Sequence, residues 1–96
     1  MALLGDAEVG RRLAALAGWR REGREIRKTY AFQSFRDAIA FVNRVADLAE
    51  RADHHPDIDI RYDRVTLALS THSAGGLTAR DFELAGAIEA GQIGTS

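Results

Sequence analysis

At residues 54–56 the hydrophobic period of the chain changes from about 3.6 residues to two. Over residues 34–49 apolar side chains recur at every third or fourth position, which is the spacing of one face of an α-helix. Over residues 57–70 apolar and polar side chains alternate, as they do in β-strands with one buried face. A long amphipathic helix must therefore lead into a β-hairpin, and the only proline of the chain, Pro56, marks the strand start.

The predicted helix begins at Ser34, because Ser34-x-x-Asp37 has the form of a capping box. Its expected buried stripe consists of residues at helical spacing, namely Phe35, Ala38, Ile39, Val42, Val45, Ala46 and Ala49. Phe41 and Leu48 fall beside this stripe. We expect these two residues either to widen the buried face or to contact another subunit.

The predicted hairpin turns at residues 63–64, where aspartate tolerates the left-handed backbone conformation. With Tyr62 opposite Val65, continuation of the ladder places His55 opposite His72. Directly paired side chains on adjacent strands lie close together. We therefore expect two imidazoles to meet at the open end of the hairpin.

Three further elements follow from local patterns. Residues 6–17 predict a short helix, and residues 19–32 predict a hairpin that turns at Gly23. Residues 78–81 form a second capping box, and the helix that follows should end near Gly91.

The predicted elements run in the order α-ββ-α-ββ-α. This order predicts an α+β fold of two layers, in which helices pack on one face of a four-stranded antiparallel sheet. The 96 residues should form a single domain over residues 1–96, because chains divide into domains only at much greater lengths. A hydrophobic content of 46% and a charged content of 28% are those of a globular chain and exclude intrinsic disorder.

Composition also argues against several functions. The formal net charge of −1 disfavours nucleic acid as a partner, since nucleic-acid-binding proteins usually carry a basic excess. The absence of cysteine excludes disulfides, thiolate zinc sites and cysteine nucleophiles. The N-terminus lacks the pattern of a secretory signal, and no apolar run is long enough to span a bilayer. We therefore expect a cytoplasmic protein with no membrane partner.

The three histidines of the chain form the main candidate site, because the predicted hairpin gathers them at its junction with the long helix. An acidic residue one helical turn earlier and polar residues on the same hairpin face complete the cluster. Its members are Glu50, His54, His55, Asp57, Ser70 and His72. Imidazole titrates near neutral pH, which suits general acid–base catalysis.

Other interpretations of the histidines stay open. Clustered histidines can be solvated or structural residues. Three imidazoles near acidic residues can also bind a divalent metal ion, although adjacent strand residues such as His54 and His55 point to opposite faces. A serine nucleophile is disfavoured, because no glycine loop suited to an oxyanion hole precedes a helix.

The motif residues resemble those of one enzyme family over nearly the whole chain. The matching positions are Glu50-x-x-x-His54-His55-Pro56, Tyr62, Leu69-Ser70-Thr71-His72, Gly76-Leu77-Thr78 and Asp81. At this spacing, and within this order of elements, they resemble pterin-4a-carbinolamine dehydratase, a family also called the dimerisation cofactor of a homeodomain transcription factor.

The resemblance implies dehydration of 4a-hydroxytetrahydropterin, the product of aromatic amino acid hydroxylases, to quinonoid dihydropterin. The family uses no metal and no bound cofactor. By position, the resemblance implies that His54 and His72 are the acid–base pair and that His55 binds substrate. It implies that Glu50 orients an imidazole.

Further positions carry expectations of substrate binding. Ser70 and Thr71 resemble the segment whose backbone holds the pterin ring, and Asp57 is an additional candidate on the predicted polar face. Asp81 matches the final acid of the motif, and we expect it mainly to cap a helix. Several family members have an aromatic residue where this chain has Ile58, a difference expected to affect packing or the pocket wall.

The resemblance also implies partners. Family members assemble into homodimers or homotetramers through sheet edges and helices, and an aromatic amino acid hydroxylase would supply the substrate. The alternative function is a non-catalytic scaffold or transcriptional coactivator built on the same fold.

Overall fold

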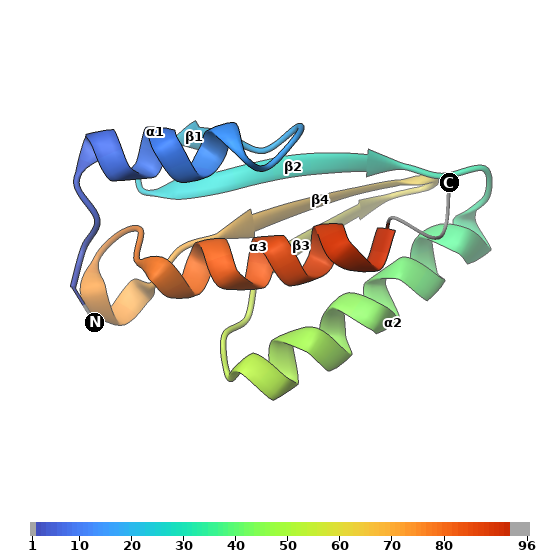
Figure 1. Ribbon diagram of the computed structural model, residues 1–96. Coiled ribbons are helices and arrows are strands. Elements are labelled where there is room, and N and C mark those ends of the chain that lie inside the picture. The colour runs from blue at the N-terminus through green and yellow to red at the C-terminus, as the bar shows by residue number, and fades with distance from the viewer. Residues whose placement is uncertain (1, 93–96) are drawn as a thin grey trace.

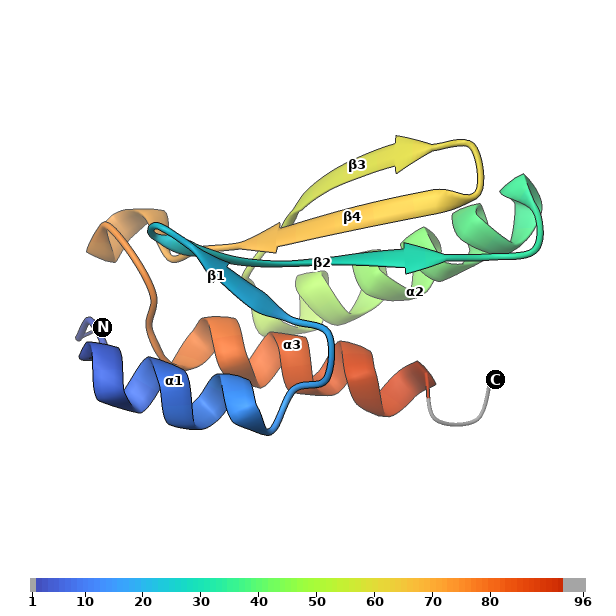
Figure 2. The same ribbon diagram turned by 90° about the horizontal axis from the view of Figure 1, so that it is seen from above.

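The structure is a computed structural model that describes residues 2–92, and its elements follow the predicted order α-ββ-α-ββ-α (Figure 1). Strands β1, β2, β4 and β3 form, in that spatial order, one four-stranded antiparallel sheet. All three helices lie on one face of this sheet, which confirms the predicted α+β architecture (Figure 2). The elements are α1 (Asp6–Ala14), β1 (Arg20–Glu22), β2 (Glu25–Ala31), α2 (Phe35–Ala52), β3 (Asp57–Arg61), β4 (Arg64–Leu69), the short 3₁₀ helix η1 (His72–Ala74) and α3 (Ala79–Gln92).

Helix α1 is shorter than the predicted span of residues 6–17 and buries only Val9 fully. The chain turns at Gly18, whose φ of 83° lies in the left-handed region, and this turn leads into β1. None of the helices within the described residues is long and apolar enough to cross a membrane.

The register of the β3–β4 hairpin differs from the predicted one by two residues. Arg61 pairs with Arg64, so the turn consists of Tyr62 and Asp63 rather than residues 63–64. Tyr62 adopts a φ of 53°, which is uncommon for a bulky residue. The sequence therefore did not indicate a turn at this position. A slip of two residues keeps every side chain on its predicted face, because the side-chain period of a strand is two. The expected opposition of His55 and His72 across the ladder is therefore wrong, since β3 begins only at residue 57.

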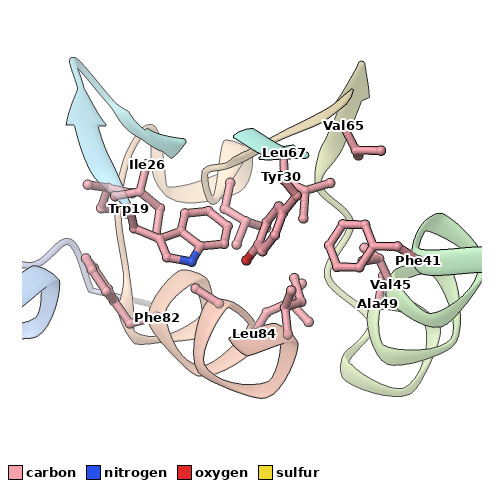
Figure 3. Packing of buried hydrophobic residues seen from close by; sticks show 14 of the residues in the cluster. Trp19, Ile26, Tyr30, Phe41, Val45, Ala49, Val65, Leu67, Phe82 and Leu84 are labelled. Carbon is pink, nitrogen blue, oxygen red and sulfur yellow. The ribbon is translucent and has the colours of Figure 1, made fainter. Parts of the chain in front are cut away.

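The buried face of α2 is rotated from the predicted stripe. Phe41, which the sequence placed beside the stripe, is 1% exposed, whereas Phe35 is 51% exposed. Phe41 packs against Tyr30 and Phe32 of the β2 region, with ring centroids 4.5 Å and 5.0 Å apart. These rings fill the space between the sheet and the helices, as Figure 3 shows for Tyr30 and Phe41. Phe41 is thus a core residue and not a subunit contact.

Lys28 interrupts the apolar alternation of β2, and the structure supplies the reason. Its ammonium group donates hydrogen bonds to the Ala17 carbonyl at 2.8 Å and to both carboxylate oxygens of Glu89 at 2.9 Å. It also lies 4.7 Å from the centroid of the Tyr30 ring, and the Tyr30 hydroxyl donates to Glu89. This polar cluster ties the loop after α1 and strand β2 to helix α3.

This polar cluster predicts that the free energy of unfolding decreases at alkaline pH. Burial, reinforced by the hydrogen bond to Glu89 and its negative charge, raises the pKa of Tyr30 far above its ordinary value of 10.0. Stability from the neutral phenol is therefore complete below about pH 10 and falls as pH rises further, because the unfolded chain ionises first. We expect Tyr30→Phe to make the decline of unfolding free energy above pH 10 shallower, as measured by urea unfolding across pH.

The other tyrosine is the matched control for this experiment. Tyr62 is 71% exposed on the β3–β4 turn, so Tyr62→Phe should keep the alkaline decline of the wild type. Identical pH profiles for wild type and Tyr30→Phe would contradict the interpretation.

Candidate active site

The end of α2 fixes where the first histidine lies. Asp53 adopts the left-handed conformation, with φ of 50°, and the backbone N–H of His54 donates to the Ala49 carbonyl at 3.1 Å. Arg80 of α3 donates to the carbonyls of Ala52 and Asp53, at 3.0 Å and 2.5 Å. The chain therefore leaves α2 in a defined direction, held by both helices.

His54 is buried against Asp81, a carboxylate with no solvent exposure. The two groups meet at 2.6 Å between His54 Nε2 and Asp81 Oδ1. The second carboxylate oxygen, Oδ2, accepts hydrogen bonds from the backbone N–H of Thr78 and from the Thr71 hydroxyl, each at 2.9 Å. One carboxylate thus caps α3, as the sequence predicted, and holds His54, a second role that the capping pattern did not reveal.

This contact determines the tautomer of His54. An ionised carboxylate only accepts hydrogen bonds, so Nε2 of His54 carries a hydrogen and donates it to Asp81. The remaining ring nitrogen, Nδ1, is then the atom that can take up or release a proton.

His55 and Glu50 form a more exposed pair. Their closest atoms, His55 Nε2 and Glu50 Oε2, lie 2.5 Å apart, with 55% and 76% of the side chains exposed. The pair spans the end of α2 and the segment that leads to β3. The structure therefore places Glu50 beside His55 and not beside His54.

His72 begins the 3₁₀ helix η1, directly after β4, and is exposed. Its imidazole makes no hydrogen bond with any residue in the described range 2–92. The turn that carries it is held by Thr71, whose carbonyl accepts from the N–H groups of Ala74 and Gly75 at 3.0 Å. His72 is thus a free imidazole on a fixed turn.

All three imidazoles line one open pocket of about 230 Å³, which we call the histidine pocket. They are brought together by the exit from α2 and by η1, not by strand pairing as predicted. The histidine pocket is lined by Asp53, His54, His55, Ser70, Thr71, His72, Ser73 and Arg80.

The other predicted site residues lie in different surroundings. Asp57 is the exposed first residue of β3, and neither it nor Glu50 lines the histidine pocket. The Ser70 hydroxyl donates to the Arg24 carbonyl at 2.7 Å, and the Thr71 hydroxyl is engaged by Asp81. Within residues 2–92, no group of three or more His, Asp or Glu side chains is arranged to hold a metal ion.

Arg80 is a pocket residue that the sequence analysis did not single out. Its guanidinium joins the end of α2 to the start of α3 and lines the pocket beside His54. No local motif marks it, because its partners are backbone carbonyls that are distant in the sequence. Together, a carboxylate-bound imidazole, a free imidazole and a nearby cation can bind a polar ligand and move protons on it.

Comparisons with known proteins find relatives along almost the whole chain. A family model described as pterin 4 alpha carbinolamine dehydratase matches residues 2–91. A relative from Roseiflexus castenholzii, provisionally named as a pterin-4-alpha-carbinolamine dehydratase, is 64% identical over 88 residues, which are 92% of this chain and 95% of that protein.

Two solved structures share the fold. A transcriptional coactivator/pterin dehydratase from Brucella melitensis has a TM-score of 0.88 at 34% identity, covering 92% of this chain and 96% of that one. A pterin dehydratase-like protein identified as a RuBisCO assembly factor in the alpha-carboxysome has a TM-score of 0.65 at 26% identity, covering 76% of this chain and 87% of that one. With a family match along almost its full length and a relative at 64% identity, this chain belongs to the pterin-4-alpha-carbinolamine dehydratase family.

Proposed function

We propose that this protein dehydrates 4a-hydroxytetrahydropterin to quinonoid dihydropterin by histidine general acid–base catalysis, as a cytoplasmic enzyme of pterin recycling. The family supports a dehydratase acting on a pterin. The single observation that supports histidine catalysis is that His54, His55 and His72 line the same pocket. An aromatic amino acid hydroxylase would supply the substrate.

Two proton transfers accompany the reaction. The C4a–O bond breaks, the hydroxyl leaves as water after accepting a proton, and the ring N–H beside C4a loses its proton. The electron pair on that nitrogen forms the new double bond to C4a. Hydroxide is a poor leaving group, so a positioned acid accelerates the step by about 10²–10⁴-fold.

We assign these transfers to His54 and His72. His54 acts through Nδ1, because Asp81 occupies its Nε2. His72 has two uncommitted ring nitrogens among the described residues and lines the same pocket. Because the adjacent nitrogen already assists departure of the hydroxyl, acid–base assistance is sufficient for the reaction.

The remaining residues are assigned to binding. His55, oriented by Glu50, contacts the substrate at the exposed side of the pocket. Ser70 offers backbone groups to the ring, since its hydroxyl is engaged by the Arg24 carbonyl. Thr71 lines the pocket beside it, with its hydroxyl and both of its backbone groups already hydrogen-bonded within the chain. Asp57 does not line the pocket, so we assign it no role in substrate binding.

The direct test is the rate at which the purified protein removes 4a-hydroxytetrahydropterin generated in the cuvette. We expect the absorbance of the carbinolamine to decay faster in proportion to added protein, above its spontaneous dehydration. A decay rate equal to that in buffer would refute the proposal.

A non-catalytic role is the second candidate, favoured by the pterin dehydratase-like RuBisCO assembly factor among the structural relatives. In that case a partner protein would be recovered at a fixed stoichiometry, and replacement of the histidines would not affect its binding. We expect turnover that is lost when the histidines are replaced and no partner recovered at a fixed stoichiometry, a result that separates the two functions.

We also propose that the protein assembles into a homodimer or homotetramer through the β3 edge of the sheet. Ile58 and Ile60 are 38% and 39% exposed, although they lie opposite Leu67 and Val65, which are fully buried. The helices cover β2 and β4 but leave β3 at the open side (Figure 2). An apolar edge strand of this kind favours pairing with a second copy.

Replacing Ile60 by aspartate should convert the oligomer to a monomer, because a charge would then be buried at the contact. Light scattering after gel filtration measures the mass directly. Arg61→Asp, on the opposite face of the same strand, is the matched control and should weaken assembly less. A wild-type mass equal to that of one chain would contradict the proposed assembly.

A further inference from the structure

Thr71 is linked to both of the histidines to which the proton transfers are assigned. Its neighbour in the chain is His72, the first residue of η1, and its hydroxyl contacts Asp81, the partner of His54. Thr71 is 2% exposed and lines the histidine pocket. One residue therefore connects to His72 through the backbone and to His54 through a carboxylate.

The backbone of Thr71 closes the turn that carries His72. Its N–H donates to the Gly76 carbonyl at 2.9 Å, and its carbonyl accepts from the N–H groups of Ala74 and Gly75 at 3.0 Å. Thr71 and Gly76 also form an isolated β-bridge. The positions of Thr71 and of the turn that carries His72 are therefore fixed together.

The hydroxyl hydrogens of Thr71 and Thr78 can be assigned from their contacts. A hydroxyl has one hydrogen, and an ionised carboxylate only accepts, so the Thr71 hydroxyl donates to Asp81 Oδ2 at 2.9 Å. The contact of 2.8 Å between the two hydroxyl oxygens is then a donation from Thr78 to Thr71. Thr78 Oγ1 in turn accepts from the backbone N–H of Arg80 at 3.3 Å. The hydrogen bonds run in one direction, from the first turn of α3 to the carboxylate.

These hydrogen bonds reinforce one another. Thr71, Thr78 and Asp81 are each 2% exposed or less, and a hydrogen bond to a charged group is stronger in such surroundings than in water. A hydroxyl that accepts a hydrogen bond is also polarised into a better donor. The donation from Thr78 therefore strengthens the bond from Thr71 to the carboxylate.

The bond from Thr71 orients the carboxylate of Asp81. The Thr78 N–H also donates to Oδ2, at 2.9 Å, but this bond belongs to the local helix cap. The Thr71 hydroxyl approaches the same oxygen from the segment between β4 and η1. Because a carboxylate is planar, donors that fix Oδ2 also fix the direction of Oδ1, which accepts from His54 Nε2.

We propose that Thr71 is a positioning residue of the dehydration, whose hydroxyl fixes Asp81 and thereby the orientation and tautomer of His54. This inference rests on the proposed function, in which Nδ1 of His54 transfers a proton. The N–H, carbonyl and hydroxyl of Thr71 are all hydrogen-bonded within the chain. Thr71 therefore acts through Asp81 and not by binding the substrate.

Thr71→Val tests the proposal, because valine keeps the branched shape of the side chain and removes the hydroxyl. We expect kcat to fall about tenfold, the effect of one lost hydrogen bond to a charged group, while KM changes by less than about twofold. Thr71→Ser keeps the hydroxyl and should restore most of the rate. Carbinolamine decay measures kcat and KM, at a temperature well below the Tm of each variant.

The imidazole of His54 gives a second readout, which does not depend on turnover. In protein labelled with ¹⁵N, the NMR shifts of the two ring nitrogens distinguish the two tautomers. The wild type should show the hydrogen on Nε2 of His54, in accord with its bond to Asp81. Thr71→Val should show a mixture of tautomers and a weaker signal from the Nε2 hydrogen.

Two other threonine variants separate positioning from a general loss of stability. Thr78→Val removes the hydroxyl at the start of α3 and should lower Tm at least as much as Thr71→Val. It leaves the bond from Thr71 to Asp81 in place, so kcat should fall by less than about threefold. Thr66→Val is the matched control, because its hydroxyl lies 2.8 Å from that of Thr29 in a pair between β2 and β4 that does not contact Asp81. Its kcat should equal that of the wild type.

The outcomes separate this inference from the proposed function. No turnover by the wild type would remove both. Turnover with an unchanged kcat in Thr71→Val, a loss confined to KM, or equal losses of kcat in Thr71→Val and Thr78→Val would overturn the role of Thr71 alone. An unchanged tautomer of His54 in Thr71→Val would overturn it as well. If Thr71→Val folds poorly by circular dichroism, Thr71→Ala carries the same expectations and gives the deciding measurement.

Discussion

Replacing His72 by alanine is expected to reduce the dehydration rate about 10²–10⁴-fold, the usual contribution of a positioned acid or base. His54→Ala should give a loss of the same order, because Nδ1 of His54 is the second proton-transfer atom. The increases in activation free energy caused by the two substitutions should not add in the double variant, since both groups act on one bond-breaking step. Carbinolamine decay measures all three variants, with the spontaneous rate subtracted.

The two histidines differ in what their removal does to stability. His72 is exposed and makes no hydrogen bond within residues 2–92, so His72→Ala should change the unfolding free energy by less than about 0.5 kcal/mol. His54 is buried, and its removal leaves Asp81 short of a partner, so His54→Ala should also lower stability. Full activity in a folded His72→Ala variant would eliminate the acid–base assignment.

Asp81→Ala is expected to destabilise the protein more than any other polar substitution in the site. It removes the N-terminal cap of α3, which contributes about 0.5–2 kcal/mol, and leaves buried donors on Thr71 and His54 unpaired at about 1–3 kcal/mol each. The sum, about 2.5–8 kcal/mol, is a large part of the stability of a small domain. In a thermal melt it should lower Tm by more than about 10 °C.

Asp81→Asn separates the structural role of this side chain from its role at His54. The amide oxygen can still accept from Thr78 and Thr71, so most of the cap survives. Its NH₂ group would face His54 Nε2 and favour the opposite tautomer, with the hydrogen on Nδ1. We expect kcat to fall at least tenfold while Tm falls by much less than in Asp81→Ala.

Asp37 provides the matched control for both Asp81 variants. It occupies the equivalent position in the first turn of α2, where its backbone N–H donates to the Ser34 hydroxyl, and its side chain is exposed. Asp37→Asn should leave the rate unchanged and the melt almost unchanged. If Asp81→Asn behaves in the same way, the carboxylate does not set the His54 tautomer.

The element order and the sheet could be predicted because local signals agreed with one another. The capping box at Ser34 and the alternation of β4 each correspond to observed contacts. The rotated face of α2 could not be predicted, because Phe41 is buried by Tyr30 and Phe32 from another element. Tyr62 was misplaced for a related reason: its left-handed backbone is imposed by the pairing on either side.

At the candidate site, the three histidines could be grouped from the sequence, but the geometry that gathers them could not. The strand pairing proposed for His55 and His72 was wrong by two residues, and the tertiary placement of the α2 exit brings them together instead. Asp81 matched the final acid of the family motif, but its expected role as a helix cap was enough to explain its presence. No contact with His54 was therefore predicted. Its contact with His54 joins residues that are far apart in the chain, which local patterns do not encode.

The edge position of β3 has a consequence for the imidazoles that precede it. Pro56 separates His55 from β3 by one residue, and β3 is hydrogen-bonded to β4 alone. In an isolated chain this edge strand can detach from β4 while the rest of the sheet stays paired, with rapid amide exchange, and its detachment would carry His55 away from the pocket. Association of two copies along β3 would suppress that local opening, so turnover per chain should rise with protein concentration.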